Sequence, residues 1–210
     1  MWTSRLFRLE NLLCWFSSAI IQDIDTMRRA GLVSLAYYYF DFRDDRKKGI
    51  HGLVSSLLVQ LCHQSDSYRD MVSKFSELAK VSRCPGDDEL VLCLKRLLKL
   101  AGQAPVYLIV DALDECPTDM PAREEVLTLV RQLTTSNYPN LHICVTSRLE
   151  PDLSLVLEPL SSRSITLHDE SGQKDDIASY IKSVVHTDPK MQACDKELVI
   201  SVLTRKVDGM

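Results

Sequence analysis

Apolar side chains in the first half of the chain alternate between helical spacing and one short continuous run. Residues 9–29 carry apolar positions three and four apart, which predicts a helix that ends before Gly31. The run from Val33 to Phe42 is rich in aromatic residues and predicts a buried strand. Three amphipathic helices are predicted next, over Ile50–Cys62, Tyr68–Leu78 and Leu90–Ala101.

The second half of the chain continues the alternation. Val106–Val110 is a continuous apolar run, typical of a central parallel strand, and a helix is expected over Ala122–Thr135. Strands that alternate with helices indicate βαβ units, so we predict a three-layer α/β/α fold with a mainly parallel sheet. The remaining predictions are strands over Leu141–Thr146 and Ser164–Leu167, and helices near Asp175–His186 and Asp195–Val207.

Three carboxylates crowd into the turn that follows the Val106–Val110 strand, at Asp111, Asp114 and Glu115. A charge at the end of a buried strand is costly without a partner, and magnesium bound to nucleotide phosphates would offset the repulsion. In such a site Asp111 holds the magnesium shell, Glu115 orients the attacking water and Asp114 positions the turn. The alternative left open is an exposed turn whose acids only cap the next element.

Arg148 follows the Leu141–Thr146 strand in the sequence Val145-Thr-Ser-Arg148. Ligands of parallel sheets bind beyond the carboxyl ends of the strands, where Asp111 and this arginine both fall. A guanidinium suits a γ-phosphate because its fork makes two charge-assisted hydrogen bonds. A lone arginine after a strand is more often a surface residue, so its interpretation depends on the acidic turn.

Four segments of the chain carry a family pattern in order: Leu35–Asp44, Leu53–Leu61, Tyr107–Cys116 and His142–Arg148. Together they resemble the NACHT domain of fungal NOD-like receptors, in the nephrocystin-like branch of the signal-transduction (STAND) P-loop NTPases. The resemblance implies a P-loop NTPase fold, ATP or ADP bound with magnesium, and a nucleotide-dependent switch that oligomerises to pass on a signal. It also implies that Asp111 is the Walker B magnesium residue, that Asp114 and Glu115 are the acidic pair after it, and that Arg148 is a phosphate sensor.

The chain departs from that family at its amino end. The family has a G-x-x-x-x-G-K-[ST] loop shortly before the helix that matches Ser17–Asp23, whereas this chain has no glycine before Gly31 and no Gly-Lys pair. Residues 1–8 lack the apolar character of the family's first strand. We therefore expect a truncated domain without a P-loop or first strand, with 1–16 as a divergent segment and 17–210 as a partial NACHT domain.

The composition of the chain argues against some classes of binding partner. The net charge of −4 and the absence of a long basic run argue against nucleic acid and anionic lipid as partners. The seven cysteines form no C-x-x-C pair, so we expect free thiols, no zinc site and a cytoplasmic protein. No apolar run has the length of a membrane span.

These observations favour a degenerate NACHT module in which Asp114 and Glu115 are a vestigial catalytic pair and nucleotide binding is weak or absent. It would act through protein contacts in signalling or innate-immunity-type recognition, with an intact NACHT receptor or a second copy of itself as partner. One alternative is an ATP- or GTP-dependent switch whose P-loop is lost only from this version of the sequence. Another is a helical protein-interaction module with no nucleotide role, built on the helices between Ile50 and Ala101.

Overall fold

Five strands form one sheet in the order β2-β3-β4-β1-β5 in the computed structural model of the chain. The β2–β3, β3–β4 and β1–β4 pairs are parallel, which confirms the predicted α/β class with a mainly parallel sheet. The strands are β1 (Arg5–Glu10), β2 (Ser34–Tyr39), β3 (Val106–Asp111), β4 (Leu141–Ser147) and β5 (Ser161–Thr166).

The structure describes residues 5–10, 13–44, 47–78, 85–100, 104–118, 121–136, 138, 140–166, 182, 185–186, 196–197 and 199–202, with main chain alone for 5–10, 13–16 and 164–166. The chain divides into two units, Met1–Ile165 and Thr166–Met210. Residues 1–16 thus fall in the same unit as the sheet. The assignment of 17–210 to one partial NACHT domain stays a prediction.

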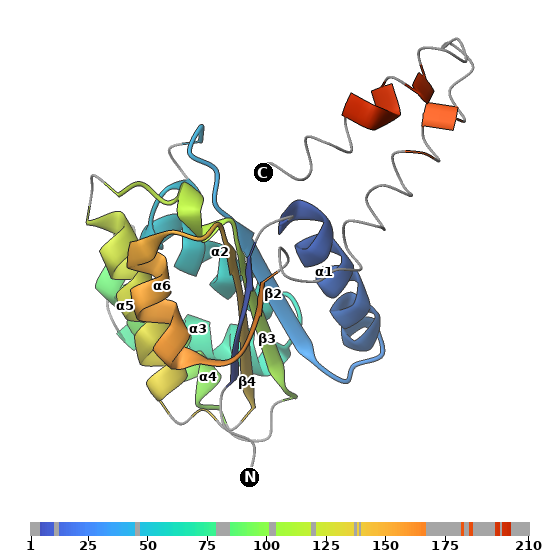
Figure 1. Cartoon of the computed structure of the whole chain (residues 1–210). Coiled ribbons are helices and arrows are strands. Elements are labelled where there is room, and N and C mark those ends of the chain that lie inside the picture. Colours follow the sequence, from blue (N-terminus) through green and yellow to red (C-terminus); the bar gives the residue numbers. More distant parts are fainter. Residues whose placement is uncertain are drawn as a thin grey trace. The chain divides into compact units, whose positions relative to one another are not determined.

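The helices cover the two faces of the sheet unequally. Figure 1 shows α1 (Leu13–Arg29) alone on one face and the other labelled helices on the opposite face. Their bounds agree with the predicted periodicity to within a few residues. The helix predicted over 9–29 is shorter, because Leu9 and Glu10 belong to β1 and α1 begins at Leu13, and α6, which begins at Pro151, was not predicted. The other helices are α2 (Ile50–Cys62), α3 (Asp66–Leu78), α4 (Asp87–Leu98), α5 (Ala122–Thr135) and α6 (Pro151–Leu157), with short 3-10 turns η2 (Leu113–Glu115) and η3 (Glu158–Leu160).

Leucines of the helices that cover one face of the sheet make up much of the core. They are almost fully buried, and each contributes roughly 1.5–3 kcal/mol of hydrophobic stabilisation. This packing fixes the positions of the strand ends. Among them are Leu53, Leu57 and Leu61 of α2 and Leu94 and Leu97 of α4.

The expectation that the first strand is missing was wrong. Arg5–Glu10 forms β1, which pairs in parallel with β4 and lies between β4 and β5 in the sheet. Its sequence, with charges at Arg5, Arg8 and Glu10, has no apolar run, because an internal strand is also specified by main-chain hydrogen bonds that side-chain pattern does not encode. The sheet therefore has no gap at this place.

In the unit Thr166–Met210 the described residues are few and mostly helical. The Lys196 ammonium donates to the His186 carbonyl at 2.8 Å, and Val185 is buried. The predicted helices near Asp175–His186 and Asp195–Val207 lie largely outside the described residues. No helix in the described part of the chain is long and apolar enough to cross a bilayer.

Candidate functional site: the carboxyl edge of the sheet

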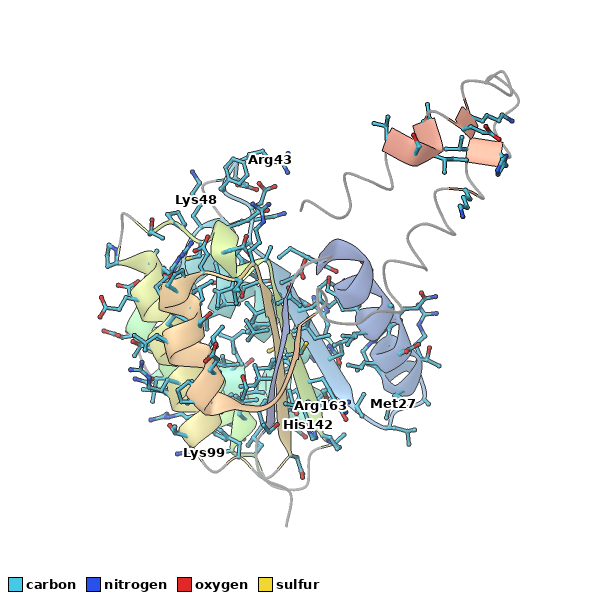
Figure 2. The ribbon with its side chains drawn as sticks, viewed as in Figure 1. Met27, Arg43, Lys48, Lys99, His142 and Arg163 are labelled. Carbon is cyan, nitrogen blue, oxygen red and sulfur yellow. The ribbon has the colours of Figure 1, made fainter. Side chains whose placement is uncertain are left out.

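The carboxyl ends of β3 and β4 bring the predicted site residues to one edge of the sheet. β3 ends at Asp111 and β4 at Ser147, immediately before Arg148. Figure 2 shows Arg43 and Lys48 at this end of the molecule and His142, from the start of β4, at the other. The sequence-based expectation that the acidic turn and Arg148 share one edge is met.

Asp111 is 2% exposed, and hydroxyl groups surround its carboxylate. The Thr146 hydroxyl of β4 donates to Asp111 Oδ1, and the buried Ser17 of α1 also hydrogen-bonds the carboxylate. Thr146 Oγ1 in turn accepts the Ala112 N–H at 3.0 Å. Asp111 is thus partnered by hydroxyl groups from two elements, α1 and β4.

Burial dominates the electrostatics of Asp111. Loss of solvation raises the pKa of its carboxyl, the hydrogen bonds from Thr146 and Ser17 oppose that rise, and the nearby Asp114 adds to it. The net direction is upward, so the protein environment favours the neutral acid more than water does. A buried carboxylate of this kind is held by hydroxyl dipoles and has no cationic partner among its described contacts.

Ala112 turns the chain sharply away from β3. Its φ of 54° and ψ of 48° lie in the left-handed region, which is costly for a residue with a Cβ. The Thr146 bond to its N–H and the bond from the Glu115 N–H to its carbonyl, at 2.9 Å, hold this conformation. The turn directs Asp114 and Glu115 along η2, away from Asp111.

Asp114 and Arg148 form a pair that fastens the end of β4. The Arg148 N–H donates to Asp114 Oδ1 at 3.0 Å, and Arg148 Nε lies 3.4 Å from Asp114 Oδ2. The Asp114 side chain is 5% exposed, whereas that of Arg148 is 71% exposed. The acid therefore accepts a main-chain bond in the interior, and the arginine reaches it from solvent.

Glu115 has a main-chain partner on a third segment. Its Oε2 accepts the Phe42 N–H at 3.3 Å, which ties η2 to the loop after β2. Arg43 is close enough that the Glu115 charge helps to raise the pKa of its guanidinium, after the larger effect of Asp41. Each of the three predicted acids thus has a structural hydrogen bond.

Arg123 at the start of α5 is the residue that sequence reasoning missed. It is 6% exposed, and its guanidinium donates to the Cys116 carbonyl at 2.8 Å and to the Asp114 carbonyl at 2.6 Å. It also donates to Glu150 and, at 3.1 Å, to Asp152. Burial alone would lower its pKa, but these two acids outweigh that effect and the net shift is upward.

A hollow of about 510 Å³ lies beside this network. Asp114, Glu115 and Arg148 line it together, but Asp111 does not. The predicted magnesium residue therefore does not share this hollow with the predicted acidic pair and sensor arginine. The other lining residues are Phe42, Lys48, Cys116, Pro117, Thr118, Arg123 and Glu150.

The residues present do not fit a nucleotide phosphate with magnesium. A phosphate cradle needs a row of free backbone N–H groups from a glycine-rich loop, and the sequence before α1 has no glycine. The buried Ser147 hydroxyl has no partner among the described residues, but one hydroxyl cannot replace such a row. Within the described ranges no cluster of three or more His, Cys, Asp or Glu is placed to hold a metal ion.

Comparison with known proteins agrees with the motif order. The family model for the N-terminal region of nephrocystin 3 matches residues 15–148, more than half of the chain. The chain belongs to the nephrocystin 3 N-terminal family. The match covers Asp111, Asp114, Glu115 and Arg148, and it confirms the resemblance to the nephrocystin-like NACHT branch.

A curated relative of this nephrocystin-type chain is the vegetative incompatibility protein HET-E-1 of Podospora anserina. The two are 29% identical over 166 residues, which are 76% of this chain but 12% of HET-E-1. The relationship to a fungal NACHT-type protein is thereby supported. The chain spans only a small part of this relative.

Two solved structures resemble the chain weakly. The ORC1 protein of Aeropyrum pernix, solved in complex with DNA, is 14% identical with a TM-score of 0.46, and the match covers 85% of this chain and 43% of that one. PCH-2 of C. elegans is 15% identical with a TM-score of 0.32, over 85% of this chain and 51% of that one. The fold description therefore rests on the strand order and pairing given above.

Proposed function

We propose that this chain is a NACHT-type module that does not hydrolyse nucleotide and acts through contacts with other proteins. An intact NACHT receptor or a second copy of the chain is the partner that the family relationship favours. The observation that carries the proposal is the hydroxyl-bonded Asp111, buried at the end of β3 and partnered by Thr146 and Ser17.

The proposal is supported by what the other acids do. Glu115, which would orient water in a working site, accepts the Phe42 N–H, and Asp114 accepts the Arg148 N–H. These bonds stabilise the edge of the sheet without any ligand. Acids that are retained because they stabilise the fold need no nucleotide. On this proposal the chain does not use the magnesium and ATP that its family implies.

The cysteines fit a protein of a reducing compartment, and the proposal places it in the cytoplasm. Cys62, Cys93, Cys116 and Cys144 are free thiols. Burial raises the pKa of the Cys93 and Cys116 thiols to about 11, so they are protonated and unreactive at neutral pH.

Two measurements on the full chain test the proposal. Phosphate release from ATP and from GTP with magnesium should not exceed that of a matched Glu115→Gln variant, and release that falls in that variant would refute the non-hydrolytic assignment. Co-precipitation with an intact family member that has a Gly-Lys-Ser/Thr loop should succeed with and without ATP. Failure of both co-precipitation and self-association would refute the role in protein contacts.

A further inference from the structure

β2 is the first strand of the sheet, so one of its sides faces no other strand within the residues that the structure describes. Its sequence Ser34-Leu-Ala-Tyr-Tyr-Tyr39 has no charge and no proline, and it is rich in aromatic residues. Such a strand is a template for pairing with another chain, and proteins usually protect it with lysine, proline or a bulge. None of these three protections lies within β2 itself.

Gln60 of α2 and Gln64, in the turn that follows this helix, instead occupy the outer side of β2. Gln64 Oε1 accepts the Leu35 N–H at 2.9 Å, and Gln64 Nε2 donates to the Leu35 carbonyl at 2.6 Å. Gln60 repeats the arrangement with Tyr37, at 3.1 Å for the N–H and 2.7 Å for the carbonyl. Each amide pairs with both main-chain groups of one residue, as a neighbouring strand would.

The repeat distances of a helix and of a strand explain why the two glutamine side chains match alternate residues of β2. Residues four apart on a helix are about 6 Å apart along its axis, and residues two apart on a strand are about 6.6 Å apart. Gln64 follows the last turn of α2, and its N–H donates to the Leu61 carbonyl at 3.0 Å, so this turn keeps Gln64 close to the helical path. Gln60 and Gln64 can therefore face Tyr37 and Leu35 together. The β3-facing residues alternate with these, since the Ser34 N–H and the Phe40 N–H donate to carbonyls of Pro105 and Asp111.

The remaining amide hydrogens fix the two side chains. Gln60 Nε2 also donates to the Ser56 hydroxyl at 3.0 Å, and Gln64 Nε2 to the Gln60 carbonyl at 2.8 Å. Both hydrogens of each NH2 group are used, and each Oε1 has a donor. Rotation of either amide by half a turn would set donor against donor, so each orientation is determined.

We propose that the Gln60 and Gln64 side chains, which we call the glutamine latch, prevent the β2 edge from pairing with β2 of a second copy. A second copy is the fitting occupant because the strand is uncharged and therefore does not repel itself. The rings of Tyr37 and Tyr39, with centroids 5.6 Å apart and each more than one third exposed, add apolar surface next to that edge. The glutamine latch does not depend on nucleotide, so this proposal and the proposed function fail independently.

The test compares the full chain with Gln60→Ala/Gln64→Ala and with His63→Ala, an exposed position at the end of the same helix. At concentrations low enough for the double variant to be monomeric, its backbone amide exchange should rise at least about tenfold at Leu35 and Tyr37, while Ala36 and Tyr38 keep their protection. Light scattering should show larger species as the concentration of the double variant increases. The His63→Ala variant should match the wild type in both measurements.

Adding Tyr37→Lys to the double variant should return its size to that of the wild type, because a charge on the strand opposes self-pairing. Unchanged exchange and unchanged size in the double variant would overturn the proposal. The wild type provides a test even if the double variant does not fold. Leu35 and Tyr37 amides that exchange freely in the wild type would overturn the proposal, and protection equal to that of Ala36 would support it.

Discussion

Replacing Arg123 by alanine removes a guanidinium that joins the acidic turn, α5 and the start of α6. The change deletes donors to the Asp114 and Cys116 carbonyls and to the Glu150 and Asp152 carboxylates. The sheet and the core leucines are untouched. The experiment therefore isolates what the missed arginine contributes to the candidate site.

The two carbonyls decide the magnitude. Cys116 is fully buried, and a buried acceptor left without a donor costs about 1–3 kcal/mol. The side chains of Glu150 and Asp152 are 36% and 51% exposed, so water replaces most of their lost bond, and we assign each at most about 1 kcal/mol. We expect Arg123→Ala to lower the free energy of unfolding by about 3 kcal/mol.

Urea unfolding followed by helical circular dichroism measures this difference. The midpoint should fall with little change in the slope, since the same surface is exposed on unfolding. Arg123→Lys should lie between wild type and alanine, because an ammonium cannot form the planar fork that reaches all four acceptors. Arg131→Ala, an exposed position on α5, should change stability by less than about 0.5 kcal/mol. If Arg123→Ala is as stable as Arg131→Ala, the structural role of this network is refuted.

Three further predictions concern burial. Asp111→Asn should stabilise the fold at neutral pH, because the raised pKa of the Asp111 carboxyl means that the stability of the native protein falls as pH rises above the ordinary value of 3.8. The gain in the variant should vanish below that pH, and a loss of stability at neutral pH would contradict this prediction. The Cys144 thiol, whose pKa burial raises to about 12, should resist alkylation at pH values near 8 until the chain is unfolded, and fast native labelling detected by mass spectrometry would count against this. Leu94→Ala should cost about 2–5 kcal/mol in urea unfolding, whereas the exposed Leu92→Ala should cost less than about 0.5 kcal/mol, and equal costs would show that the core is misassigned.

The helices were predictable where one apolar face decides the structure. The predicted bounds of Ile50–Cys62 and Ala122–Thr135 are those of α2 and α5, because each helix buries a regular stripe against the core. β1 was missed because it is specified by pairing with β4 rather than by an apolar run. Hydropathy reports burial of side chains and not the partners of the main chain.

The acids of the candidate site were predictable, but their partners were not. Asp111 stood out as a carboxylate after an apolar run, and its position at the carboxyl edge is as expected. Thr146 lies near the end of β4, two residues before Arg148, and a hydroxyl near the end of a buried strand is the signal that could have found it as a partner. Arg123 gave no signal, since a single arginine in the first turn of an amphipathic helix looks like a surface residue.

The central claim, that the Walker B frame is kept without nucleotide chemistry, is tested most directly by calorimetric titration of the full chain with ATP and magnesium. We predict no saturable heat up to about 1 mM nucleotide, in the wild type and in Asp111→Asn alike. Saturable binding with a micromolar dissociation constant that is lost in Asp111→Asn would contradict the claim.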